Sequence, residues 1–321
     1  MRISSMLLVV VLHSTAVAAA SAQQATGYPQ QPIHIVLPFG AGSGPDFAIR
    51  TLQPSLQQAL KQSVIVESRP GANGAIGTRA VAMSPADGYT LLGGSTGFST
   101  LAGTPAKLGF DPIKSFAPIG LSARSAGYVL VVKASSPFTS MQDLIAAGKK
   151  SQLFFGSPGT GNTLHLVAAL FAKRTDTPFK HVAYSNLADA VLATARGEVT
   201  FVFATLPAVL GQLQSGELRA IGYAGSSPLP EMPSVPLVSS IVPGFHLAEP
   251  WAGLLAPANT PIAAVTALSE ALKRSIADER YKTALHAAGY TPAWDTPSEF
   301  SAFLQQNIAS WREAAEAAGL R

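Results

Sequence analysis

The stretch that decides the fold is IVLPFGAGSGPDFAIR, residues 35–50, in which an apolar β-branched run leads through a glycine-rich turn into a helical pattern. The same order occurs in LLGGSTGF (91–98) and in FFGSPGTGNTLHL (154–166). A strand followed by such a turn and a helix is the repeating unit of α/β sheets. In an open sheet these turns lie outside the carboxyl ends of the strands, where ligands bind.

Similar strand signals recur along most of the chain. Apolar runs rich in β-branched or aromatic residues occur at IHIVLPF (33–39), VIVES (64–68), YTLLGG (89–94), YVLVV (128–132), LFFGS (153–157), FKHVAY (179–184), VTFVFA (199–204), LRAIGY (218–223) and WAGLLAP (251–257). Segments of helical period separate most of them, which predicts parallel sheets covered by helices on both faces. The length of 321 residues is enough for two such domains, each with its own core.

Two helical segments carry specific predictions. The segment from Thr296 to Gly319 places five large apolar residues on one stripe and opens with Thr296-Pro297-Ser298-Glu299, which combines capping residues with an early proline. We therefore expect one continuous C-terminal helix. Pro54 lies inside the otherwise helical stretch 46–61, and we expect a kink or a break there.

Composition excludes several classes of function. The chain has no cysteine, so it has no disulfide, thiolate metal site or cysteine nucleophile. Charged residues make up 12% of the chain and the formal net charge is only +4. Basic residues form no stripe with interleaved aromatics, so nucleic acid is not an expected partner. No cluster of histidine and carboxylate shows metal-ligand spacing, and we expect no metal and no cofactor.

The N-terminus has the form of a secretory signal. Arg2 supplies the charged region, an apolar stretch runs from Met6 to Leu12, and the small residues Ala20-Ser21-Ala22 form a cleavage site. We expect residues 1–22 to be a signal peptide cleaved after Ala22. No later run approaches the roughly 18 apolar residues of a membrane span. A protein exported to the periplasm is therefore predicted.

The glycine-rich turns suit a small anion. Glycines let successive N–H groups point inward, and the N-terminus of the following helix adds a partial positive charge. The turn from Gly156 reads G-S-P-G-T-G-N-T and fits the phosphate-loop pattern except that Asn162 replaces its lysine. Because a nucleotide needs that cation, the remaining amides and hydroxyls favour one carboxylate, and no nucleotide is expected.

Several segments, taken in order, resemble the Bug-type receptors, the extracytoplasmic substrate-binding proteins of tripartite tricarboxylate transporter systems. They are PIHIVLPFGAGSGPDFAIR, VIVESRPGANGAIGTRAVAMSPADGYTLL, GSPGTGNTLHL, HVAYSNLADAVLATARGEVTFVFATLP, LRAIGYAG and WAGLLAPANTP. The run R-P-G-A-N-G followed by P-A-D-G-Y-T-L-L is the most specific of these, and the resemblance covers nearly the whole chain after residue 22.

The resemblance implies a fold and a function. The fold is α/β: two doubly wound Rossmann-like domains in a type II periplasmic-binding-protein (Venus flytrap) arrangement with a two-strand hinge. We expect residues 23–124 plus 222–321 to form domain 1 and residues 125–221 to form domain 2. The function implied is capture of a small organic carboxylate in the interdomain cleft for uptake by membrane subunits of the tripartite type. A monomer without enzymatic activity is expected.

The expected ligand-binding residues lie on two loops and on neighbouring strand ends. The first loop contributes Phe39, Gly40, Ala41, Gly42, Ser43 and Gly44, and the second contributes Ser157, Gly159, Thr160, Gly161, Asn162 and Thr163. Other strand ends add Gly94, Ser95, Tyr184, Ala204 and Thr205. Asp46 is expected to hydrogen-bond its own turn and shape the first loop, rather than to contact the ligand.

This chain departs from the family pattern at positions that bear on specificity. Ser43 stands where a second glycine is usual, Ser68 where asparagine is usual, and Asn186 where glycine is usual. Ala204 and Thr205 stand where amino-acid-binding members tend to have an aspartate. An ammonium group would lose its partner there, so we expect a ligand without an essential amino group.

Two alternatives remain open at this point. Gly93-Gly94-Ser95-Thr96-Gly97 matches the nucleophile-elbow pattern G-x-S-x-G directly after a strand, which is compatible with an exported serine hydrolase using Ser95. The pattern is short, however, and the histidines lie in predicted helix or surface positions. The other alternative keeps the flytrap but makes it a ligand-presenting sensor for a two-component system.

Overall fold

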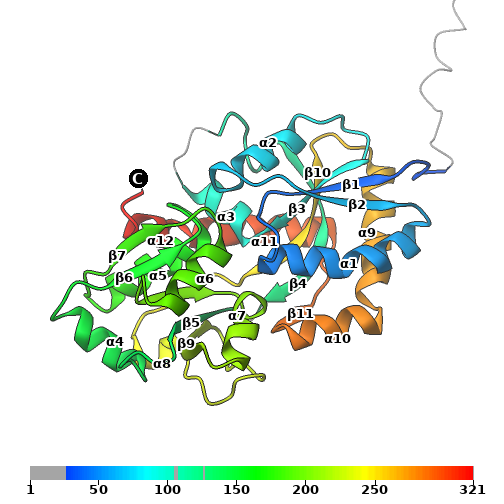
Figure 1. Cartoon of the computed structure of the whole chain (residues 1–321). Coiled ribbons are helices and arrows are strands. Elements are labelled where there is room, and N and C mark those ends of the chain that lie inside the picture. Colours follow the sequence, from blue (N-terminus) through cyan, green and yellow to red (C-terminus); the bar gives the residue numbers. More distant parts are fainter. Residues whose placement is uncertain (1–26, 105–107, 126, 321) are drawn as a thin grey trace, which may run out of the picture.

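The computed structural model describes residues 27–104, 108–125 and 127–320, so the predicted signal peptide lies outside the described residues. Two sheets organise the described chain into two lobes (Figure 1). The first lobe has a six-stranded sheet in the order β11-β4-β10-β3-β1-β2. Its strands are β1 (Ile33–Leu37), β2 (Val64–Ser68), β3 (Thr90–Ser95), β4 (Phe116–Ser125), β10 (Trp251–Pro257) and β11 (Tyr290–Pro292).

The second lobe has a five-stranded sheet in the order β7-β6-β8-β5-β9. Its strands are β5 (Gly127–Lys133), β6 (Phe154–Ser157), β7 (Lys180–Ala183), β8 (Phe201–Ala204) and β9 (Leu218–Gly225). The α/β class with two sheets agrees with the sequence prediction. The strand runs predicted parallel sheets, whereas both sheets are mixed, because β10 lies antiparallel to β3 and β5 lies antiparallel to β8.

Helices cover both sheets. Those of the first lobe are α1 (Gly44–Leu60), the 3₁₀ turn η1 (Ala72–Gly74), α2 (Ala75–Ala82), α3 (Thr96–Gly103), α9 (Ile262–Ile276), α10 (Glu279–Ala287) and α11 (Pro297–Ser310). Those of the second are α4 (Met141–Gly148), α5 (Thr163–Arg174), α6 (Leu187–Arg196), α7 (Leu206–Gln214), α8 (Val238–Ile241) and α12 (Arg312–Ala317). No helix within the described ranges is long and apolar enough to span a bilayer.

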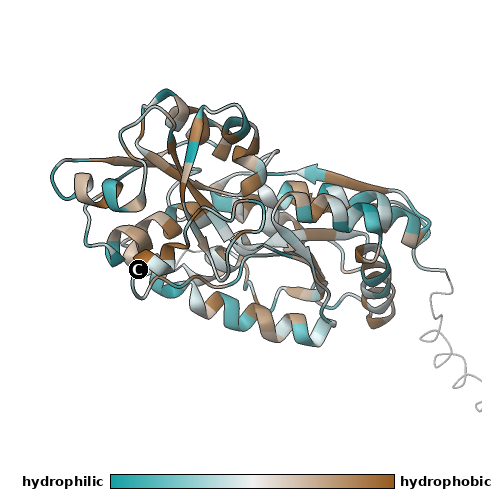
Figure 2. Ribbon diagram, turned by 90° about the horizontal axis from the view of Figure 1, so that it is seen from below, coloured by the Kyte–Doolittle hydropathy of each residue, from teal (hydrophilic) through white to brown (hydrophobic). Residues whose placement is uncertain are grey.

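Both sheets are the apolar centres of their lobes. Figure 2 shows hydrophobic residues concentrated on the strands, with hydrophilic and hydrophobic residues alternating along the outer helices. In the second lobe, the buried cluster around β5 and β8 also contains Leu229, Val235, Val242 and Phe245. The chain therefore returns to the first sheet at Pro250, later than the predicted return near residue 222, because the apolar residues after β9 pack on the second lobe.

The hinge is built from closely paired backbone. The first crossing, between β4 and β5, lies next to the predicted domain boundary between residues 124 and 125. Ser125 N–H donates to the carbonyl of Pro250 at 2.9 Å, so the outgoing and returning segments are joined side by side. Gly127 has φ of +150°, and a Cβ there would overlap the Ala224 carbonyl, so only glycine fits this crossing.

The C-terminal segment is not one continuous helix. Thr296 and Glu299 form the predicted capping box, and α11 then packs Phe300 and Ile308 on the first lobe. The helix ends at Ser310, and α12 instead packs against α5, with Trp311 and Ala314 in the core of the second lobe (Figure 1). This junction is a third connection between the lobes.

Of the kink or break expected at Pro54, the break is wrong. Residues Gly44–Leu60 form one helix through Pro54, which is exposed on its outer face. Arg50, whose carbonyl loses its helical N–H partner to the proline, is also exposed.

Candidate functional site

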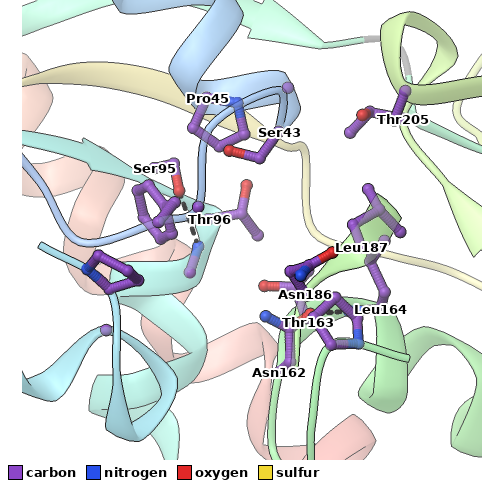
Figure 3. A pocket seen from close by; sticks show the side chains of 18 of the residues that line it. Ser43, Pro45, Ser95, Thr96, Asn162, Thr163, Leu164, Asn186, Leu187 and Thr205 are labelled. Atoms are coloured by element: carbon purple, nitrogen blue, oxygen red, sulfur yellow. Dashed lines mark hydrogen bonds between the residues drawn. The ribbon is translucent and has the colours of Figure 1, made fainter. Parts of the chain in front are cut away.

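A cleft of about 660 Å³ lies between the two lobes. Five helix N-termini form much of its wall: α1 and α3 from the first lobe, and α5, α6 and α7 from the second. Figure 3 shows Ser43, Pro45, Ser95 and Thr96 facing Asn162, Thr163, Asn186 and Leu187 across this space. Each helix N-terminus presents N–H groups without intrahelical partners and a partial positive charge, so the wall is built for negative charge.

The first loop is held in shape by Asp46. Its carboxylate accepts a hydrogen bond from Gly42 N–H at 3.0 Å and one from Arg50 Nε at 2.8 Å. Only 5% of Asp46 is exposed, and Arg50 pairs its charge. Ser43 caps α1 by accepting from Asp46 N–H at 3.4 Å. The structure thus shows the loop-shaping hydrogen bond predicted for Asp46.

Gly44 is fixed by a close approach between the lobes. A Cβ at this position would overlap the Tyr290 hydroxyl and lie 2.7 Å from Thr205 Cγ2. Any larger residue would force these side chains apart. The six predicted residues of the first loop, Phe39 to Gly44, all line the cleft.

The second loop contributes less of the wall than predicted. Asn162 lines the cleft as the N-cap of α5, where its side chain accepts from Leu164 N–H at 3.0 Å. Thr163 also lines it, but its hydroxyl lies 3.2 Å from that of Thr100 on α3, which joins the two lobes. The hydroxyl of Thr163 is therefore already engaged in one hydrogen bond between the lobes.

Four other predicted residues of this loop are absent from the lining: Ser157, Gly159, Thr160 and Gly161. The Ser157 hydroxyl lies 2.6 Å from His181 Nε2, and Gly161 N–H donates to His165 Nδ1 at 3.1 Å. Thr160 is exposed. The loop is thus held by two histidines outside the cleft lining, and most of it does not face the cleft.

Three further predicted residues are absent from the lining. A Cβ at Gly94 would meet Leu255 and Trp251, so this glycine faces the core. Ala204 is fully buried in the second-lobe core. Tyr184 packs its ring near Gly156, and burial raises the pKa of its phenol.

Ser95 lines the cleft as a capping residue. Its Oγ accepts from Gly97 N–H at 3.1 Å at the start of α3, and 1% of the residue is exposed (Figure 3). No histidine is among the described residues that line the cleft. Ser95 therefore has a structural role here and no adjacent general base, which argues against the nucleophile-elbow interpretation.

Thr205 is the lining residue with an unpaired hydroxyl. It precedes α7 without capping it, is 6% exposed, and its Oγ1 has no hydrogen-bond partner within the described part of the chain. A buried hydroxyl without a partner costs roughly 1–3 kcal/mol, so Thr205 is a candidate for contact with a bound ligand.

The structure adds residues that the sequence analysis did not assign to the site. They include the turn from Pro70 to Gly74, Thr96 and Gly97, Tyr128, Asn186 to Asp189, Ala208, Trp251 and Tyr290. The R-P-G-A-N-G run in the sequence could have indicated the turn from Pro70 to Gly74. Burial raises the pKa of Tyr128 and of Tyr290, so both phenols remain protonated.

The cleft lining carries almost no charge. Asp189 is its single charged side chain among the described residues, and no lysine or arginine joins it. Asp189 accepts from Asn186 Nδ2 at 2.9 Å in the first turn of α6, where the helix dipole favours a carboxylate. An anion in this cleft would be held by amides, hydroxyls and helix dipoles.

Comparison with known proteins gives a consistent result. The family model described as "Tripartite tricarboxylate transporter family receptor" matches residues 48–320. The chain is 30% identical to Protein BugT of Bordetella pertussis over 319 residues, which cover 97% of this chain and 96% of that protein.

Solved structures also match over most of the chain. The periplasmic binding protein BugD superposes with a TM-score of 0.85 at 27% identity, covering 92% of this chain and 99% of that chain. An R. palustris protein solved with adipate superposes with a TM-score of 0.86 at 29% identity, covering 91% and 99%.

Proposed function

The chain belongs to the tripartite tricarboxylate transporter receptor family, and from this premise we propose that it binds a small organic carboxylate between its two lobes. The bound acid would pass to membrane subunits of a tripartite transporter. The protein acts in the periplasm after export through the signal in residues 1–22, as a monomer and without catalysing a reaction.

One observation carries the proposal: five helix N-termini converge on one cleft whose lining, among the described residues, holds no cationic side chain. A site of this kind suits a carboxylate, which helix dipoles and N–H groups can stabilise. The R. palustris relative solved with adipate supports the same class of ligand. The volume of about 660 Å³ leaves room for a dicarboxylate and bridging waters.

The lining also favours an acid without an amino group. Ala204 and Thr205 offer no charge to an ammonium, and an unpaired buried ammonium costs several kcal/mol. The one lining carboxylate, on Asp189, is already engaged by Asn186. The free Thr205 hydroxyl supplies a neutral donor and acceptor instead, which suits a carboxylate or hydroxyl oxygen of the ligand.

A thermal-shift panel tests this proposal. Unbranched dicarboxylates of increasing length, from succinate through adipate, are each paired with the amino acid that differs only by an ammonium group, such as aspartate and 2-aminoadipate. A ligand present at one hundred times its Kd stabilises the folded state by about 2.7 kcal/mol, so binding raises the Tm.

We expect at least one dicarboxylate to raise the Tm while its amino partner does not. A panel in which only amino acids act would overturn the ligand class, and repeating it with Asp189→Asn would show whether that carboxylate holds their ammonium. A panel in which no acid acts at any length would contradict carboxylate binding itself.

A further inference from the structure

We propose that His165 and His181 are positioning residues of the second loop, and that its cleft-facing shape depends on a neutral His165 imidazole. The proposal rests on the carboxylate-binding function given above, because it concerns the same cleft. Neither histidine lines the cleft, so neither touches the ligand. Both act through the loop that runs from Ser157 to Thr163.

The protonation state of His165 follows from one hydrogen bond. Gly161 N–H donates to His165 Nδ1 at 3.1 Å, and a backbone N–H can only donate. Nδ1 must therefore carry a lone pair, so the neutral ring holds its proton on Nε2. Adding a proton to Nδ1 would set two N–H groups against each other and release Gly161.

His181 supports the other end of the loop. Its Nε2 lies 2.6 Å from Ser157 Oγ, which also bonds to Gly159 through both its N–H and its carbonyl. The imidazole rings of His165 and His181 have centroids 4.1 Å apart, and both stack on Phe155. Two charged rings at this distance would repel each other.

Among the described residues, no carboxylate faces the two imidazoles to stabilise a charged pair. His181 on β7 is the titratable group that faces His165. The described residues of β6, β8 and α3, which pack against α5, include no acid or base. On α12, Glu313 is paired with Arg174 at the far end of α5, whereas Arg312 and Glu316 are exposed. Beside His181, Lys180 is exposed on the opposite face of β7, and Tyr184 packs near Gly156.

Burial and the neighbouring His181 lower the pKa of His165 from its ordinary value of 6.5 to about 4, and burial also lowers the pKa of His181. Because the folded pKa of His165 lies below the unfolded one, the unfolded chain takes up the proton first as the pH falls. The contribution to stability is complete above about pH 6.5 and is lost as the pH falls toward about 4.

The loop carries this effect to the cleft. Gly159 and Gly161 have φ of +116° and +80°, and the chain between them leads directly into Asn162 and the N-terminus of α5. Losing the anchor at Gly161 would free this turn and shift the α5 amides that face the cleft. Binding of an anion should therefore weaken when His165 is charged or lacks an acceptor.

Two variants separate the effect of the hydrogen bond to Gly161 from the effect of a titrating imidazole ring. His165→Asn keeps an acceptor at the Nδ1 position but does not titrate, whereas His165→Leu keeps bulk and removes the acceptor. His286→Asn, at an exposed histidine on α10, is the matched control. Adipate affinity is measured calorimetrically at about pH 7.5 and at steps down to about pH 4, and the Tm is measured without ligand at each step.

At pH 7.5 we expect wild type, His165→Asn and His286→Asn to bind adipate alike, and His165→Leu to bind about tenfold more weakly. Between about pH 6.5 and 4 the Tm of wild type should fall relative to that of His165→Asn, while His286→Asn follows wild type. By pH 4 wild type should also lose about twofold in affinity beyond the loss of His165→Asn.

Equal affinity for His165→Leu and wild type, or parallel Tm profiles for wild type and His165→Asn, would overturn the proposal. Imidazole ¹⁵N spectra of wild type provide an independent test that needs no variant, and a protonated Nδ1 on His165 at pH 7.5 would also overturn it. If adipate binds to no variant, the carboxylate function is in question, whereas the Tm profiles and spectra still decide the role of His165.

Discussion

Thr205 has a buried hydroxyl that no described residue satisfies, and it lies in the cleft wall. Thr205→Val keeps the shape and removes the oxygen, so the ligand-free protein should gain about 1 kcal/mol in unfolding free energy while dicarboxylate affinity falls about fivefold. Chemical denaturation and calorimetry measure the two effects. Thr78→Val is the matched control, because Thr78 has the same unpaired hydroxyl on α2 outside the cleft. If Thr205→Val binds as tightly as wild type, the hydroxyl does not contact the ligand.

Asp46 shapes the first loop without lining the cleft, so its effect on binding should be indirect. Asp46→Ala removes the acceptor of Gly42 N–H and the partner of Arg50, and we expect affinity to fall about tenfold through the misplaced loop. Asp143→Ala removes a comparable capping carboxylate from α4, away from the cleft. It should lower the Tm but leave Kd unchanged. Equal effects of both variants on Kd would refute a specific role for Asp46.

For single residues, the sequence predicted which turns border the cleft but not which of their atoms face it. Glycine-rich turns after β1 and β6 were enough to locate the two loops. The orientation of the Ser157 hydroxyl depends instead on His181, which is distant in sequence. The orientation of the Gly161 N–H depends on His165, which lies on the following helix, α5. No local pattern could have revealed these partners.

Among the elements, α5 begins directly after Asn162, the residue that departs from the phosphate-loop pattern. Asn162→Lys removes the cap on Leu164 N–H and should lower the unfolding free energy by about 1 kcal/mol without creating ATP binding. Asn162→Asp keeps the cap but adds a negative charge to the cleft, so it should weaken carboxylate binding with little loss of stability. Denaturation curves and titrations with ATP and adipate distinguish the two variants. ATP binding by either the wild type or Asn162→Lys would contradict the carboxylate interpretation of this loop.

Elements with strong local patterns were predictable, and those that depend on long-range pairing were not. The runs predicted at 64–68 and 251–257 match β2 and β10 to the residue. The ten-residue strand β4 was missed because FAPIGLSARS contains proline, glycine and small residues and becomes a strand by pairing with β10 and β11. The C-terminal stripe predicted a helix but not its division at Trp311, since the second lobe supplies the contacts of α12.

For the molecule as a whole, the lobes are joined at the paired hinge and again at Trp311. Arg124 on β4 binds Glu249 before β10 at 2.5 Å and Asp295 at 3.1 Å, which ties the two hinge segments to the first lobe. Binding of an anion by both lobes should close them about this hinge. Small-angle scattering should show a smaller radius of gyration with adipate, and no change with 2-aminoadipate. An unchanged radius at saturating adipate would exclude closure.

The measurement that tests the central claim most directly is a crystal structure of the protein with the dicarboxylate that gives the largest thermal shift. A carboxylate group should lie between the lobes, within hydrogen-bond distance of N–H groups from the first loop and from the N-termini of α5 or α6. No lysine or arginine side chain should contact it. A carboxylate bound outside the cleft, or paired there with a basic side chain, would contradict the account.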